Sequence, residues 1–114
     1  MNVALGRYFE SQAAKYLKKL GHELVVRNFY SPYGEIDIIS IFNHKIRFIE
    51  VKFLSRLGKI SPVEKINTSK LRKIYFSIAY LKKFSKIKNY QVDSVGMYFK
   101  NNKLIIEYLE DLRL

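Results

Sequence analysis

Apolar residues recur every three to four positions in two segments of the chain, and this spacing predicts two amphipathic helices. The first helix is expected over residues 2–20, with Asn2 as its N-cap and Gly21 as its stop. The second helix is expected over residues 67–84. The predicted buried side of the first helix consists of Leu5, Phe9, Ala13, Tyr16 and Leu20, and that of the second consists of Leu71, Ile74, Tyr75, Ile78 and Leu81.

The remaining segments are rich in β-branched and aromatic residues, which is typical of strands. Turn residues separate these segments at 31–34, 43–44 and 100–103, and residues 54–66 contain Gly58 and Pro62 and predict a loop. We therefore expect strands at 23–30, 35–42, 46–53, 91–99 and 104–109. The resulting order, α-β-β-β-α-β-β, predicts an α/β fold with one central mixed sheet flanked by helices.

Two carboxylates face each other in the hairpin formed by residues 35–42 and 46–53. A short turn at Asn43-His44 fixes a register that places Asp37 directly opposite Glu50. Both faces of this hairpin are otherwise apolar, as in a sheet covered by helices on each side. Like charges in such a place repel each other and lose hydration. A bound divalent cation is the simplest way to offset both effects.

Lys52 shares a strand face with Glu50 and lies about 6.6 Å beyond it. Asp37, Glu50 and Lys52 together form the set of groups that metal-dependent phosphodiester hydrolysis uses. Carboxylates hold Mg²⁺ or Mn²⁺, and the lysine stabilises negative charge on the phosphate or orients the attacking water. The alternative is a buried cluster of lysine and carboxylates without a metal, which explains one carboxylate well and two poorly.

Two further acidic residues lie near this predicted site. Glu10 lies beside the buried side of the first helix, where it either reaches the sheet as a third metal ligand or pairs with Lys18 or Lys19. Its position on the helix, taken alone, slightly favours pairing with Lys18 or Lys19. Glu35 shares the strand face of Asp37 and is either an outer group of the site or a solvated carboxylate.

The chain is strongly basic, with 21 Lys and Arg residues against 10 Asp and Glu among 114 residues and a net charge of +11. This charge predicts a polyanionic partner, foremost a nucleic acid. The absence of cysteine excludes disulfides and thiolate metal sites. No apolar run is long enough to span a membrane, and the N-terminus lacks the pattern of a signal peptide, so we expect a single cytoplasmic domain without a membrane partner.

The basic residues concentrate between Glu64 and Tyr90, a segment that contains eight Lys and Arg residues and one acid. Lys70 and Lys73 fall on one exposed side of the second helix, where they could follow a phosphate backbone. The alternative is an ordinary solvated helix face. Our candidates for contacts with nucleic acid are Lys65, Lys70, Lys73 and Arg56.

Motifs at characteristic spacings run along nearly the whole chain. They are Gly6-Arg7-x-x-Glu10, Leu20-Gly21, Asn28-Phe29, Gly34-Glu35-Ile36-Asp37, Phe48-Ile49-Glu50-Val51-Lys52, Lys70 and Val92-Asp93. Together they resemble the YraN-type family of small bacterial proteins, which is assigned to the restriction-endonuclease-like PD-(D/E)XK superfamily. The pattern is also similar to archaeal Holliday-junction resolvases. The resemblance implies one nuclease-like domain over residues 1–114 with an αβββαβ core.

The resemblance also implies roles for individual residues. Asp37 would be the metal-binding aspartate, Glu50 and Lys52 the E-x-K pair, and Glu10 the acidic residue of the helix, which favours the metal-ligand reading of Glu10. Many relatives carry a small polar residue and an arginine directly after the E-x-K block, whereas three residues precede Arg56 here.

These observations lead to a main functional hypothesis and two alternatives. The main hypothesis is a Mg²⁺- or Mn²⁺-dependent endonuclease that hydrolyses DNA, with branched or damaged DNA as an expected substrate and DNA favoured over RNA. The first alternative is a non-catalytic nucleic-acid-binding module on the same scaffold, and the second is a structural or assembly protein whose charge is its only functional feature. By analogy with resolvases that act on two-fold junctions, a homodimer is a further expectation.

Overall fold

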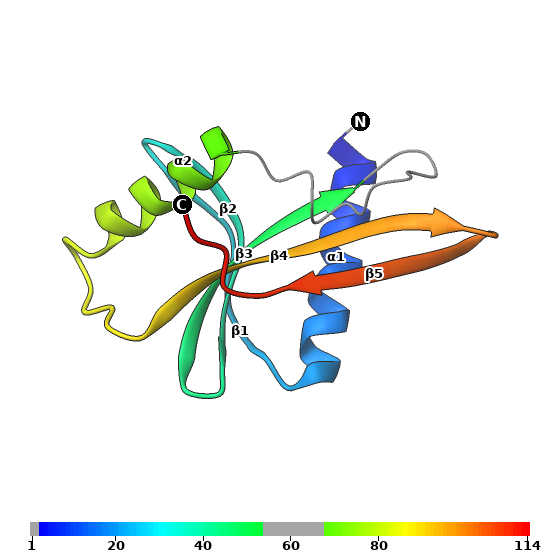
Figure 1. Ribbon diagram of the computed structural model, residues 1–114, viewed down its shortest axis with the longest axis horizontal. Coiled ribbons are helices and arrows are strands. Elements are labelled where there is room, and N and C mark those ends of the chain that lie inside the picture. The colour runs from blue at the N-terminus through cyan, green and yellow to red at the C-terminus, as the bar shows by residue number, and fades with distance from the viewer. Residues whose placement is uncertain (1–2, 54–67) are drawn as a thin grey trace.

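The computed structural model describes residues 3–53 and 68–114, and its elements follow the predicted order (Figure 1). The predicted loop at 54–66 and the predicted N-cap Asn2 lie outside the described residues. The helices are α1 (Val3–Leu20) and α2 (Thr68–Leu81), and the strands are β1 (Glu23–Ser31), β2 (Gly34–Phe42), β3 (Lys45–Phe53), β4 (Tyr90–Lys100) and β5 (Lys103–Leu109). No helix of the described part of the chain is both long and apolar enough to cross a membrane.

The strands form one five-stranded sheet in the order β1-β2-β3-β4-β5. β3 and β4 pair in parallel, and all other neighbours pair antiparallel, so the sheet is mixed as predicted. The parallel pair needs a long crossover because its two strands run in the same direction, and α2 lies within that crossover. This architecture matches the restriction-endonuclease-like core that the family resemblance implied.

Two tight turns set the register of the hairpins. Asn43 and His44 have φ values of 50° and 60°, and Asn101 and Asn102 have φ values of 51° and 61°. Positive φ at both central residues matches the right-handed twist of the flanking strands, and asparagine tolerates this conformation well. The first turn pairs Ile38 with Ile49, as the predicted register requires.

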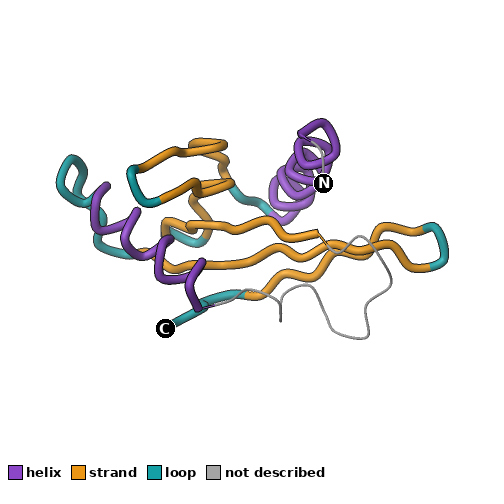
Figure 2. The backbone as a smooth tube through the Cα atoms, turned by 90° about the horizontal axis from the view of Figure 1, so that it is seen from above, coloured by secondary structure: helices purple, strands orange, loops and turns teal. Residues whose placement is uncertain are grey.

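The helices cover opposite faces of the sheet, as Figure 2 shows, and each covers its own hydrophobic cluster. Burial of these clusters from water supplies the main stabilising contribution of such a layered fold. The cluster under α1 consists of Phe9, Ala13, Ala14, Leu17, Ile38, Ile49, Val95 and Met97. The cluster under α2 consists of Ile36, Ile39, Phe48, Leu71, Ile74, Ile78 and Val92.

The buried side of α1 differs from the prediction. Leu5 and Leu20 are 40% and 44% exposed, whereas Ala14 and Leu17 are buried. The prediction was wrong at both ends because α1 crosses the strands, so that its central turns pack on the sheet and its end turns extend past it (Figure 1). With Leu17 on the buried side, Glu10 lies at the border between core and solvent.

The second helix is also shorter than predicted. It ends at Leu81, and the backbone amides of Lys83 and Phe84 bond to carbonyl groups three residues earlier, which tightens the chain into a turn. Its buried positions agree with the prediction for Leu71, Ile74 and Ile78.

A polar network centred on buried Asp93 and Arg47 links β3, β4, β5 and the chain after β5. Arg47 donates to Glu110 at 2.5 Å and to Asp93 at 3.4 Å, and Asp93 is fully buried. Tyr108 and the backbone amide of Asp111 also donate to Asp93, at 2.5 Å and 2.9 Å. Because buried charges need such partners, this network holds the C-terminal segment against the sheet.

Candidate metal centre

The β2–β3 ladder stops where the two opposed carboxylates begin. Its last pair in this direction is Ile38 with Ile49. Two residues after Ile49, the backbone amide of Val51 donates to Asp37 Oδ2 at 2.7 Å. The side chain of Asp37 therefore accepts a backbone hydrogen bond from β3, and this bond fixes its orientation. Asp37 and Glu50 are 8% and 2% exposed, so both carboxyl groups are buried as predicted.

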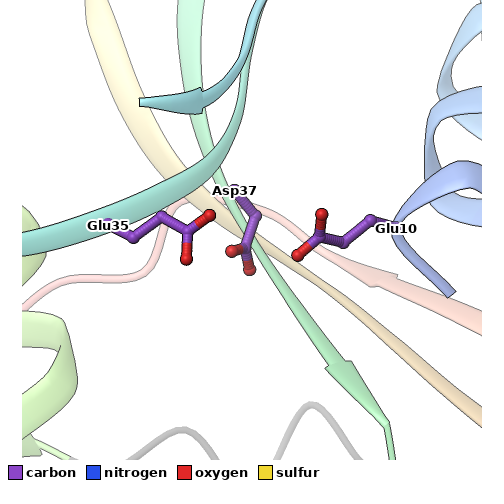
Figure 3. A group of neighbouring side chains, drawn as sticks. All are labelled: Glu10, Glu35 and Asp37. Atoms are coloured by element: carbon purple, nitrogen blue, oxygen red, sulfur yellow. The ribbon is translucent and has the colours of Figure 1, made fainter. Parts of the chain in front are cut away.

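Three carboxyl groups meet at this point (Figure 3). Glu10 from α1 and Glu35 and Asp37 from β2 each present an oxygen, and these oxygens all lie within 4.8 Å of one another. We call these three residues the carboxylate cluster. Glu10 thus reaches the sheet, and Glu35 is a member of the carboxylate cluster rather than a separate solvated group. Hard carboxylate oxygens gathered from two elements suit Mg²⁺ or Mn²⁺.

Asn28 of β1 links two members of the carboxylate cluster. Its neighbours in β1 pair with Ile36 and Ile38, so Asn28 lies opposite Asp37 in the register. In the amide orientation that satisfies all partners, its nitrogen donates to Glu10 Oε1 at 2.9 Å and to Glu35 Oε1 at 2.7 Å. Its φ of 57° is unusual within a strand and is tolerated by asparagine. These two bonds hold both glutamates toward Asp37.

Sequence reasoning gave Asn28 no role in the site. A signal was present, because asparagine is disfavoured inside strands and this one interrupts a β-rich segment. A polar residue in such a position has a structural reason that the sequence alone does not reveal.

Glu50 has a different partner from the carboxylate cluster. Lys70 Nζ of α2 lies 2.7 Å from Glu50 Oε2. Lys70 was predicted as a contact for nucleic acid, and the structure also makes it the counter-ion of a buried carboxylate. Lys52 lies two positions after Glu50 on β3, half-buried and in register with Gly96. Its catalytic role stays a prediction.

The proximity of these carboxyl groups changes their protonation. Burial, followed by the hydrogen bond with Glu50 and its charge, raises the pKa of Asp37 to about 8. Burial and the charge of Asp37 raise the pKa of Glu10 and also that of Glu35. Burial alone would lower the pKa of Lys70, but the charge of Glu50 and their hydrogen bond outweigh it and raise that pKa. Without a cation, protons balance part of the negative charge.

Two clefts open on either side of the carboxylate cluster. The α2 cleft, of about 400 Å³, is lined by Asp37 and Glu35 on one side and by Lys70 and Lys73 on the other. The α1 cleft, of about 230 Å³, is lined by residues that include Arg7, Glu10, Asn28 and Glu35. Glu35 lines both, so the clefts adjoin each other across the cluster. The acidic centre is therefore flanked by cationic side chains on both sides.

Of the other predicted contacts for nucleic acid, only Lys73 lies within the described residues. Lys73 is exposed and lines the α2 cleft, beside Lys70. Arg56 and Lys65 lie outside the described residues, so their role stays a prediction.

Comparison with known proteins places this chain in a family. The model of the Uncharacterised protein family UPF0102 matches residues 9–97. The chain belongs to the UPF0102 family. This membership confirms the resemblance to YraN-type proteins, and the matched range contains the carboxylate cluster together with Asn28, Glu50, Lys52 and Lys70.

Individual UPF0102 proteins align over most of the chain. A UPF0102 protein of Clostridium perfringens is 35% identical over 96% of this chain and 93% of its own length. One of Campylobacter hominis is 38% identical over 93% of this chain and 92% of its own length. One of Rhodococcus jostii is 45% identical over a shorter stretch, 64% of this chain and 62% of its own length.

Proposed function

We propose that this UPF0102 protein is a Mg²⁺- or Mn²⁺-dependent endonuclease that hydrolyses phosphodiester bonds in DNA. The observation that carries the proposal is the convergence of Glu10, Glu35 and Asp37 within 4.8 Å between two clefts that cationic residues line. The close approach of three carboxyl groups, with Asp37 buried and Glu10 and Glu35 half-buried, is unfavourable by itself, and it raises the pKa of each. A divalent cation would remove this repulsion.

The residues of the cluster would hold the cation, and the cationic residues would hold the substrate. When bound, a Mg²⁺ or Mn²⁺ ion polarises the phosphate and lowers the pKa of a bound water. Asp37 is fixed by the Val51 amide, and the two glutamates are fixed by Asn28, so the donor oxygens need little rearrangement. Glu50 lies beside Asp37 and would complete the donor set once Lys70 moves away from it.

Lysine side chains would stabilise the negative charge that develops on the phosphate. Lys52 is our candidate for this role, as the E-x-K pattern implies. Lys70 would exchange Glu50 for a phosphate oxygen, because a cation at the cluster takes over the neutralisation of Glu50. Lys73 and Arg7 line the two clefts and would follow the phosphate backbone on either side of the reacting bond.

The direct test is a cleavage assay with purified protein on duplex, branched and single-stranded DNA and on RNA, with Mg²⁺, Mn²⁺ or EDTA. We expect cleavage with a metal ion and none with EDTA. Asp37→Asn and Glu10→Gln should lower the rate by about 100-fold or more, since each removes a metal ligand. Glu23→Gln is the matched control, because Glu23 is exposed and pairs with Ile41 at the far end of β2.

Two other outcomes would redirect the interpretation. Binding of nucleic acid that is unaffected by EDTA and by Asp37→Asn, without cleavage of any substrate, would replace the enzyme with a non-catalytic binding module. Absence of both cleavage and binding would refute the proposal entirely. Sedimentation of the protein with and without branched DNA would test the expected homodimer.

A further inference from the structure

Four aromatic side chains form a continuous row on the surface next to the α2 cleft. The ring centroid of Tyr33 lies 5.6 Å from that of Phe76 and 6.5 Å from that of Tyr80, and Tyr80 lies 5.2 Å from Phe84. We call these residues the aromatic row. Tyr33, Phe76 and Phe84 are 46%, 48% and 70% exposed, so packing in the core does not account for their position.

Hydrogen bonds tie the first ring of the row, Tyr33, to α2. The turn between β1 and β2 lies next to α2 (Figure 1). Tyr33 is part of this turn, and its backbone amide donates to Ser31 Oγ at 3.0 Å. The hydroxyl of Ser31 in turn lies 2.7 Å from that of Ser77 on α2. The turn is therefore tied to the helix that carries Phe76 and Tyr80. A platform held in this way loses little conformational freedom when a ligand binds.

The aromatic row begins at the candidate metal centre. Tyr33 lines the α2 cleft together with Glu35 and Asp37, and Lys73 lines the same cleft one helical turn before Phe76 and Ser77. A ligand whose phosphate lies at the carboxylate cluster would thus have its next groups over the rings.

The charge around the row selects the class of ligand. Residues 68–89, which carry three of the four rings, contain no Asp or Glu and seven basic residues, namely Lys70, Arg72, Lys73, Lys82, Lys83, Lys86 and Lys88. Exposed rings among cations suit a ligand that alternates flat aromatic groups with negative charges. A nucleic acid with unpaired bases has this character, whereas the bases of a duplex are already stacked inside it.

We propose that the aromatic row binds unpaired nucleotides by stacking against their bases, so that the substrate carries a single-stranded segment beside the bond that is cleaved. This inference rests on the proposed function for the position of the reacting phosphate. It goes further by assigning a substrate structure and the residues that recognise it. The charged cleft would hold the backbone, and the rings would distinguish unpaired from paired strands.

The test is a binding measurement in EDTA, which requires no cleavage. Fluorescence anisotropy would compare a labelled oligo(dT) 20-mer with a blunt oligo(dT)–oligo(dA) duplex of the same length, for the unmodified protein and for Tyr33→Leu and Phe76→Leu. We expect each variant to bind the single strand about 10-fold more weakly and the duplex less than about twofold more weakly. Tyr8→Leu is the matched control, because Tyr8 is 46% exposed on α1.

The salt dependence gives a second, independent reading. The slope of log K against log salt should be unchanged in Tyr33→Leu and Phe76→Leu, since rings release no counterions, and should become shallower in Lys73→Met. Circular dichroism would confirm that each variant is folded, and the use of two separate ring variants protects the test against loss of one.

Three outcomes would overturn the inference. The first is that the protein binds neither the single strand nor the duplex, and the second is that the ring substitutions weaken binding of both equally. The third is that the substitutions leave binding unchanged but alter the oligomeric state, which would make the row a protein–protein interface. These results are distinguishable from failure of the proposed function. A protein that cleaves nothing can still show the expected selectivity, and an active nuclease can lack it.

Discussion

Replacement of Asp37 by asparagine should stabilise the protein without a cation and remove its response to one. Asparagine preserves the size of the side chain and retains an oxygen that can accept the bond from the Val51 amide. It cannot carry the negative charge that opposes Glu50, Glu10 and Glu35. The variant therefore separates the electrostatic strain of the site from its packing.

The magnitude follows from the protonation of Asp37. Its pKa is about 8 in the folded protein, against an ordinary value of 3.8. Between these two values the folded state binds more protons than the unfolded state, so this group makes stability fall as pH rises. The slope is at most about 1.4 kcal/mol per pH unit, or roughly 3 kcal/mol between pH 5 and pH 7. Asp37→Asn has no such slope, so its advantage in unfolding free energy should grow with pH.

The assay is equilibrium urea unfolding in EDTA at pH 5, 6 and 7, followed by circular dichroism because the chain has no tryptophan. Glu23→Gln serves as the control for a carboxylate outside the site. A second series with Mn²⁺ should stabilise the unmodified protein, by about 1.4 kcal/mol at ten times the dissociation constant, and leave Asp37→Asn unchanged.

One result would refute this reasoning about the site. If the difference in unfolding free energy between Asp37→Asn and the unmodified protein were the same at pH 5 and pH 7 within about 0.5 kcal/mol, the folded state would retain no proton at Asp37. The carboxylate cluster would then be an ordinary hydrated acidic group.

Three further substitutions test other parts of the structure. Asn28→Asp tolerates the same backbone conformation but replaces the amide donor by a fourth carboxylate, so thermal unfolding should show a loss of about 2 kcal/mol at pH 7 and less at pH 5. Lys70→Met should strengthen Mn²⁺ binding in calorimetry while weakening DNA binding, because Lys70 competes with the cation for the buried carboxylate of Glu50. Lys73→Met should weaken DNA binding alone, and equal effects of the two substitutions on Mn²⁺ binding would contradict this reasoning. Arg47→Met should lower the unfolding free energy by about 3–5 kcal/mol, because the buried carboxylate of Asp93 loses its counter-charge, and Arg113→Met, in an exposed ion pair, by less than about 1 kcal/mol.

The sequence by itself determined the hairpin at the centre of the site. The alternation of apolar residues and the turn at Asn43-His44 are local features, and a register error of one residue would turn the apolar side chains to the wrong face. The pairing of Ile38 with Ile49 and the burial of Asp37 and Glu50 were therefore predictable. The order of the elements was predictable for the same reason, because helix and strand periods are read from neighbouring residues.

The tertiary structure alone decided which side chains meet. Glu10 and Lys70 lie on helices that cover opposite faces of the sheet, and their distances to Asp37 and Glu50 depend on how each helix crosses the strands. No local pattern encodes those crossings. The predicted buried side of α1 was wrong at Leu5 and Leu20 for this reason.

The position of Asn28 shows the same limit most clearly. Its sequence context marks an irregular strand residue, but its two bonds to Glu10 and Glu35 exist only because α1 lies beside β1 and β2. Local periodicity determines the elements and their faces, since it acts between residues a few positions apart. Packing between elements determines the chemistry of the site, since it brings together carboxyl groups that are distant along the chain.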